Sequence, residues 1–149
     1  MKLVTRIFGA AMLFIGLMQP AMALDEVYSD FFGNAIEGYD PVAYFSEGKA
    51  LKGDKAWELE WKGADWRFSS QANLAAFKEN PEKYAPQYGG YCAWAVSQGY
   101  TAKIDPEAWH IHDGKLYLNY NASVQSTWQQ DIPGNIVKAD QNWPQLLAK

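Results

Sequence analysis

The clearest structural signal in this chain is the segment AWHIHDGKLYLN, residues 108–119. Apolar and polar side chains alternate on both sides of Asp113-Gly114, a dipeptide that favours a two-residue type I′ turn between antiparallel strands. The segment therefore predicts a β-hairpin. Because strand side chains alternate between two faces, we expect one face, the less buried one, to carry the polar set His110, His112, Lys115 and Tyr117.

A second hairpin is predicted upstream by the segment WELEWKGADWRF, residues 57–68. Its alternation is interrupted by turn-forming residues at 62–65 and places the aromatic side chains on one face. Ser69 or Ser70 can cap a following helix, in which Leu74 and Phe77 share the inner face and which Pro81 prevents from extending far. A hairpin followed by a capped helix is a compact α+β unit.

The remaining segments predict further helices. Gly89-Gly90 breaks the chain before a short buried helix that begins close to Cys92, and Gly99 ends it. Residues 122–149 predict two helices broken at residues 132–134, and Pro144 should end or kink the second one. The side chains expected to face inward from this tail are Val124, Trp128, Ile136, Val137, Trp143 and Leu146.

Together these elements predict one α+β domain over residues 24–149. We expect the two hairpins to form one small antiparallel sheet, with several short helices packed against it. No internal repeat, low-complexity tract or long linker divides this range.

The first 23 residues have the layout of a cleavable signal peptide. Lys2 and Arg6 precede an apolar run at residues 7–18, and Ala-Met-Ala follows at residues 21–23. The run is shorter than the roughly 20 residues that a membrane span needs. We expect cleavage after Ala23 and a periplasmic location; an uncleaved anchor is the alternative. No other segment is apolar enough to cross a bilayer.

Charge excludes one class of partner. The chain has 13 basic and 17 acidic side chains, and removal of the signal peptide leaves 11 basic and 17 acidic ones, a net charge of −6. An acidic surface without a basic run repels phosphate backbones, so a nucleic acid is not an expected partner.

Three segments resemble the YHS domain family: GYDPVAYF at residues 38–45, the aromatic hairpin at residues 61–68, and FKENPEKY at residues 77–84. Two more, YGGYCA at residues 88–93 and DGKLYLNY at residues 113–120, look like the exported subgroup of YHS domain-containing (seleno)proteins. Many YHS domains accompany heavy-metal transporters, and the metal-binding version of the motif carries cysteines where this chain has Ala43, Ser69 and Asn73. The resemblance therefore implies the fold but not the usual metal site.

Cys92 is the first candidate for chemistry, as a ligand or redox residue, and it is the only cysteine, so no disulfide can form within the chain. A thiol near a helix start, beside Gly89 and Gly90, has a lowered pKa. The selenoprotein name of the subgroup fits redox chemistry there. Burial among aromatic residues opposes this by raising the pKa, and we expect Cys92 to react more slowly than a free thiol.

His110 and His112 are the second candidate, because two imidazoles at i and i+2 of a strand point the same way and can chelate a transition metal ion such as copper or zinc. Such a pair needs a third ligand, for which Cys92, Asp113 and Tyr117 are the choices. Lys115 across the turn would repel the ion. The alternative is a solvated pair on the outer face of the hairpin.

A phenol-rich set is the third candidate, and its Tyr-Asp-Pro element at residues 39–41 could line a ligand pocket. The members of this set are Tyr39, Asp40, Tyr84, Tyr88, Tyr91 and Tyr100. The alternative is a core with hydrogen-bonded hydroxyls, with Asp40 as a turn residue before Pro41. No motif of a standard hydrolase, kinase or disulfide exchanger occurs.

The sequence as a whole favours a non-enzymatic periplasmic binding protein of the YHS type, with a small-ligand or metal-ion site near Cys92. A thiol-dependent redox protein or sensor acting through Cys92 is the main alternative. A protein-interaction module that packs an aromatic face against a partner is the third.

Overall fold

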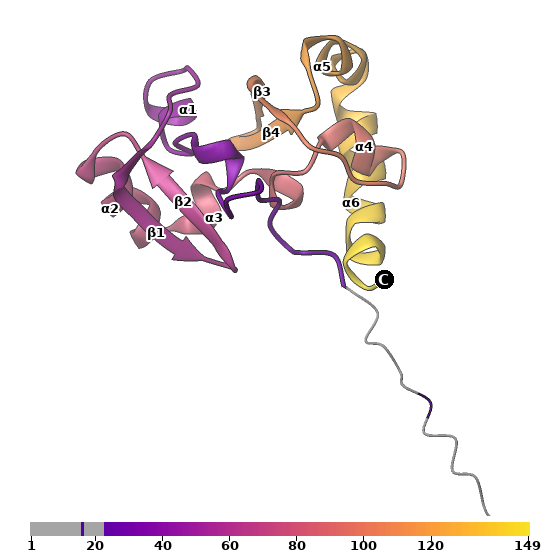
Figure 1. Ribbon diagram of the computed structural model, residues 1–149. Helices are drawn as coiled ribbons and strands as arrows, with labels where there is room; N and C mark the ends of the chain where they lie inside the picture. The colour runs from indigo at the N-terminus through magenta and orange to yellow at the C-terminus, as the bar shows by residue number, and fades with distance from the viewer. Residues whose placement is uncertain (1–15, 17–22) are drawn as a thin grey trace, which may run out of the picture.

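The computed structural model describes residue 16 and residues 23–149 (Figure 1). Apart from Gly16 and Ala23, the predicted signal peptide lies outside the described residues. The elements follow one another as η1 (Ile36–Gly38), α1 (Ala43–Ser46), β1 (Asp54–Trp61), β2 (Ala64–Phe68), α2 (Gln71–Glu79), α3 (Pro81–Tyr84), η2 (Gln87–Gly90), α4 (Ala93–Ser97), β3 (Asp105–His112), β4 (Lys115–Asn119), α5 (Ala122–Gln129) and α6 (Ile132–Leu147).

The β1–β2 hairpin forms as predicted, with a tighter turn. Only Lys62 and Gly63 connect the strands, and both have positive φ angles, as a type I′ turn requires. The buried face of β2 carries Trp66 and Phe68, which pack on Phe77 of α2 with ring centroids 5.0 and 5.2 Å apart. These aromatic residues of β2 are thus part of the core.

The helix after this hairpin is capped as predicted by Ser70, whose Oγ accepts a hydrogen bond from the backbone N–H of Asn73. Pro81 begins the next helix, α3, where a proline needs no N–H partner. Helix α2 packs against both β1 and β2, whereas α3 packs against α2 and β4.

The β3–β4 hairpin has the predicted register and turn, with His110 opposite Tyr117 and positive φ angles at Asp113 and Gly114. The histidine face is the less buried one, as predicted: His110 and His112 are half-buried and Lys115 is exposed, whereas Leu116 and Leu118 are fully buried. Leu116 and Leu118 enter the core shared with β1–β2, while Tyr117 on the other face is buried with Trp128 of α5 in a second core. The hairpin lies between two cores and contributes to both.

The α+β class is confirmed, but the two hairpins do not form one sheet. Each is a separate two-stranded antiparallel sheet. They are joined by side chains instead of edge-to-edge hydrogen bonds, because the apolar faces of both strand pairs pack into the same core. A hydrogen bond from the hydroxyl of Tyr44 in α1 to the carbonyl of Pro106 in β3, at 2.8 Å, fixes the second hairpin against the first half of the chain.

The C-terminal helices form as predicted, but the break between them lies two residues earlier. Asp131 caps α6 by accepting a hydrogen bond from the N–H of Gly134 at 3.1 Å, so Pro133 sits in the first turn of the helix and does not interrupt it. Pro144 does not end α6, which continues to Leu147. Val137, expected to face inward, is 57% exposed. The other face of α6 covers α4.

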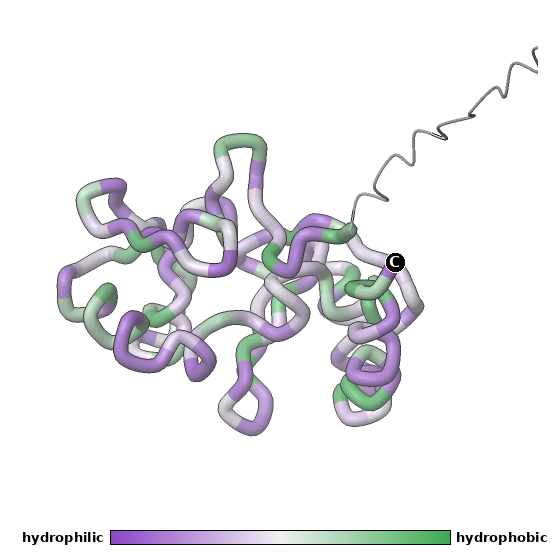
Figure 2. The backbone as a smooth tube through the Cα atoms, turned by 90° about the horizontal axis from the view of Figure 1, so that it is seen from below, coloured by the Kyte–Doolittle hydropathy of each residue, from purple (hydrophilic) through white to green (hydrophobic). Residues whose placement is uncertain are grey.

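Figure 2 shows short hydrophobic and hydrophilic stretches alternating along the described chain. Among the described residues, no helix combines the length and apolar character that a bilayer crossing demands. Such alternation is typical of a folded domain in which each element buries one apolar face in a shared core.

Candidate functional site

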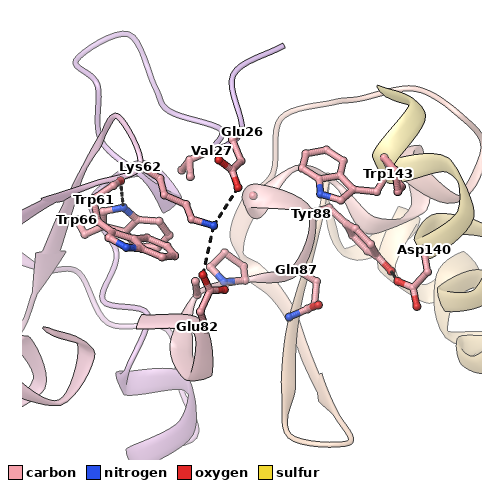
Figure 3. Close-up of a pocket in the computed structure, with 14 residues that line it drawn as sticks. Glu26, Val27, Trp61, Lys62, Trp66, Glu82, Gln87, Tyr88, Asp140 and Trp143 are labelled. Atoms are coloured by element: carbon pink, nitrogen blue, oxygen red, sulfur yellow. Dashed lines mark hydrogen bonds and ion pairs between the residues drawn. The ribbon is translucent and has the colours of Figure 1, made fainter. Parts of the chain in front are cut away.

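A cleft of about 320 Å³ lies between the first hairpin and the C-terminal helix. Its walls come from four separate segments: the N-terminal strand-like segment before η1, the β1–β2 turn, the α3–η2 segment and α6. Figure 3 shows charged side chains of the first three segments on one side and aromatic and acidic groups of η2 and α6 on the other. We call this concavity the α6 cleft.

One wall of the α6 cleft is organised around Lys62 at the tip of the β1–β2 hairpin. Its Nζ lies 2.9 Å from Oε1 of Glu26 and 3.3 Å from Oε1 of Glu82. The same Nζ lies 4.7 Å from the ring centroid of Trp61, within range of a cation–π interaction. The hydrogen bond to Glu26 is the main reason that the pKa of Lys62 is raised, so the ammonium stays charged.

The opposite wall is formed by Tyr88 of η2 with Asp140 and Trp143 of α6. The hydroxyl of Tyr88 donates to Oδ1 of Asp140 at 2.9 Å, and the rings of Tyr88 and Trp143 meet at 6.0 Å between centroids. Burial first, and then the hydrogen bond to Asp140, raise the pKa of Tyr88, which keeps the hydroxyl protonated and donating. The carboxylate of Asp140 is therefore the hydrogen-bond acceptor of this pair, at the surface of the cleft.

The floor between the two walls depends on a close approach of two chain segments at Gly89. The N–H of Tyr28 donates to the carbonyl of Gly89 at 2.9 Å, and the hydroxyl of Tyr91 donates to the carbonyl of Asp25 at 2.9 Å. Gly89 has a φ of +61°, and a Cβ there would overlap the carbonyl oxygen of Glu26. Only glycine lets the N-terminal segment lie this close.

Cys92 caps the start of α4, as predicted, but does not line the α6 cleft. Its side chain is 1% exposed, and its Sγ lies 3.6 Å from Oδ1 of Asn119, which also accepts from the N–H of Trp94 at 3.0 Å. Burial raises the pKa of Cys92 despite nearby backbone hydrogen bonds that act in the opposite direction. The thiol is therefore protonated and covered near neutral pH.

We expect Cys92 in the folded protein to react with a maleimide at pH 7 more than about tenfold more slowly than in the urea-unfolded chain, because both its raised pKa and its burial reduce the accessible thiolate. Time-resolved mass spectrometry of the labelled protein measures both rates. A folded-state rate equal to or above the unfolded rate would contradict the buried assignment and support the redox alternative.

The two histidines share one face of β3, with ring centroids 6.5 Å apart. His110 packs on Trp128, with ring centroids at 5.8 Å, and its pKa is lowered by burial and then by the proximity of His112. His112 faces Asp113, with Nε2 3.4 Å from Oδ2. In the described part of the chain, no three histidine, cysteine or acidic side chains come together as a set that could hold a metal ion, so Cys92 and the histidines do not form one ligand group there.

Asp40 is fully buried and acts as a hydrogen-bond hub. Its Oδ1 accepts from the N–H groups of Val42 and Ala43, and its Oδ2 accepts from the N–H and Oγ of Ser69 and from Nδ2 of Asn73. Ser69 and Asn73 are two of the three positions for which the resemblance in the sequence implied cysteines in a metal-binding version of the motif. Both side chains here donate to a carboxylate, and neither offers the thiolate that a soft metal prefers, so this group does not fit such a metal.

The two candidate tyrosines lie apart from each other. Tyr39 precedes Asp40 and forms an isolated β-bridge with Lys52, whereas Tyr91 packs its ring on Tyr28 and Trp143 at 5.6 and 5.8 Å between centroids. Neither lines the α6 cleft, but the ring of Tyr91 packs against the ring of Trp143, which does line it. Of the phenol-rich set, Tyr88 lines the cleft, whereas the other site candidates lie outside it: Tyr39, Asp40, Tyr91, Cys92, His110 and His112.

The residues that do line the cleft had no signal in the sequence as a group. They are Glu26, Trp61, Lys62, Glu82, Tyr88, Asp140 and Trp143, and each has an ordinary role on its own element. Lys62 occupies a turn, Glu82 lies on the exposed side of α3, and Trp143 is one more aromatic residue of an amphipathic helix. The sequence feature that could have pointed to the cleft is Gly89, which was interpreted from the sequence, together with Gly90, as a chain break.

Comparison with known proteins gives one match. Residues 42–88 match the YHS domain. Searches among curated proteins and among solved structures found no match to the chain. The matched range includes the Lys62 wall of the α6 cleft and ends at Tyr88, whereas Glu26, Asp140 and Trp143 lie outside it.

Proposed function

We propose that this chain, which contains a YHS domain, is an exported, non-enzymatic binding protein that takes a small ligand in the α6 cleft. The observation that carries the proposal is the convergence of a lysine, three carboxylates and aromatic rings from four segments on one concavity of about 320 Å³. Ligand sites are concave, lined by aromatic surface and provided with a few placed polar groups, and they start at about this volume.

The construction of the cleft supports the same proposal. The matched YHS range supplies one wall, and the segment beyond it adds α6, which contributes Asp140 and Trp143. Among the described groups, the cleft holds no activated nucleophile, because Cys92 is buried elsewhere. Aromatic faces and fixed charges without a reactive group are suited to binding. The site thus lies beside the segment that precedes Cys92 and does not include its thiol.

Export rests on the N-terminal pattern of Lys2, Arg6, an apolar run and Ala-Met-Ala. Expressed in a Gram-negative host with its own N-terminus, the protein is expected in the periplasmic extract with a mass that begins at Leu24. Recovery of the uncleaved chain from the membrane fraction would contradict export. The material from this experiment is then used for the binding test.

Binding is tested by titrating the exported protein with small amines, carboxylates and neutral sugars while following the indole N–H of Trp143 and the amide of Gly89 by NMR. We expect at least one of these classes to shift both signals in a saturable way. Gln87 lines the cleft, and its side chain forms no hydrogen bond among the described residues, so Gln87→Trp should fill part of the space and weaken binding at least about tenfold.

The matched control is Gln71→Trp, which adds the same indole at the exposed start of α2, outside the cleft. It should bind as the unmodified protein does. If no class of ligand shifts the two signals, or if Gln87→Trp binds as tightly as Gln71→Trp, the α6 cleft is not a binding site and the proposed function is wrong.

A further inference from the structure

The α6 cleft carries more negative than positive charge. Among the side chains that line it, Glu26, Glu82 and Asp140 are acidic and Lys62 is the one base. The lysine is shared between the two glutamates, which leaves Asp140 without an ion-pair partner among the described residues. An anionic ligand would meet three carboxylates and a cation that is already neutralised, whereas a cationic ligand would restore the balance.

The surroundings of Lys62 show how this cleft accommodates a positive charge, because the lysine ammonium is itself a cation. Its ammonium lies against the face of Trp61 and between two carboxylates, at 4.7 Å from the ring centroid and at 2.9 and 3.3 Å from the carboxylate oxygens. Ring face and carboxylate together offset the loss of water around a positive group. An indole ring and a carboxylate therefore already stabilise one cation in this cleft.

The opposite wall repeats that pair without a cation. Asp140 and Trp143 are three residues apart on α6, so their side chains leave the same side of the helix, and both line the cleft (Figure 3). The carboxylate of Asp140 accepts from Tyr88 through Oδ1, and its Oδ2 has no hydrogen-bond partner among the described residues. Pro144, also in this wall, has no N–H to donate to the carbonyl of Asp140 four residues before it.

From this repetition we infer that the ligand of the α6 cleft is a small organic cation with an apolar body, whose positive group lies between the carboxylate of Asp140 and the ring of Trp143. The inference rests on the proposed function, since it names the ligand class of the same cleft. The free carboxylate oxygen of Asp140 accepts a hydrogen bond from the cation, and the apolar body lies on the Tyr88 and Trp143 rings.

The test compares three four-carbon probes of similar size, n-butylammonium, 1-butanol and butyrate, by NMR titration of the exported protein. We expect butylammonium to bind at least about tenfold more tightly than either of the others, with the indole N–H of Trp143 among the shifted signals. Added salt should reduce this preference, because it rests on a charge pair near the surface.

Asp140→Asn removes the charge while keeping the size and an acceptor for Tyr88, and it should reduce the advantage of butylammonium over butanol about fivefold or more. Asp113→Asn is the matched control: it removes the same charge at the β3–β4 turn, where asparagine suits the positive φ of 49°. This variant should keep the full preference.

Four outcomes contradict the inference. If butanol or butyrate binds as tightly as butylammonium at Trp143, the cation assignment is wrong and the cleft remains a binding site. If a compound of the wider panel binds there and butylammonium does not, the same conclusion follows. If nothing binds, the proposed function fails together with this inference. A preference that survives Asp140→Asn would place the positive group elsewhere in the cleft.

Discussion

Replacement of Asp40 by alanine is expected to lower the free energy of unfolding by about 3 to 5 kcal/mol. The carboxylate is fully buried and accepts five hydrogen bonds, from three backbone N–H groups and the side chains of Ser69 and Asn73. Alanine would leave these donors without partners in a site closed to solvent, and each unsatisfied buried group costs about 1 to 3 kcal/mol, reduced by local relaxation. The link between α1 and α2 would be lost with them.

Urea unfolding followed by tryptophan fluorescence measures this change. Asp30→Ala is the matched control, because Asp30 makes the same local type of contact, accepting from the N–H groups of Phe32 and Asn34 at 2.9 and 3.0 Å, but in a half-buried turn whose tip, Phe31 and Phe32, is exposed. Its expected loss is about 1 kcal/mol or less, since water replaces the lost acceptor. A loss for Asp40→Ala that is no larger than that for Asp30→Ala would show that the buried hub does not stabilise the fold.

Replacement of Gly89 by alanine is expected to lower the free energy of unfolding by about 2 kcal/mol or more and to abolish ligand binding in the α6 cleft. The new Cβ would overlap the carbonyl oxygen of Glu26, so the N-terminal segment must move away. That movement breaks the hydrogen bond from Tyr28 to Gly89 and carries Glu26 away from Lys62. The change thus acts on stability and on the cleft wall together.

Gly99→Ala separates the close approach from backbone strain. Gly99 also has a positive φ, +90°, but nothing lies within 4 Å of where its Cβ would be. We expect this variant to lose only about 1 kcal/mol, the cost of a left-handed alanine, and to bind in the cleft normally. Equal losses in the two variants, in urea unfolding and in NMR titration, would mean that the approach of residues 26 and 89 does not shape the cleft.

Local elements were predictable because the interactions that select them act over a few residues. The Asp113-Gly114 turn and the alternation around it determined the register of β3–β4, down to His110 opposite Tyr117. Ser70 was identifiable as a cap from its place before an amphipathic run. The α+β class follows from such signals. The break between α5 and α6 was misplaced because Pro133 was taken as an interruption, whereas prolines are well tolerated in the first turn of a helix.

Burial of the two faces of β3–β4 was not predictable in the same way. Alternation shows that two faces differ, but it does not say whether a later helix covers the polar one. Here α5 brings Trp128 onto Tyr117 and His110, so Tyr117 belongs to a second core while the two histidines stay half-buried. The single-sheet prediction failed for a related reason, since periodicity contains no information on whether two hairpins meet by their edges or by their faces.

The sequence by itself determined the strands, turns, caps and the acidic balance of this protein, because each depends on neighbouring residues or on composition alone. Only the tertiary structure decided where a ligand could bind. Glu26, Lys62, Glu82 and Asp140 are spread over more than a hundred positions, and none is distinctive on its own element. They become one site because Gly89 admits the N-terminal segment and because the second core places α6 opposite the first hairpin, and such long-range packing leaves no periodic trace in the sequence.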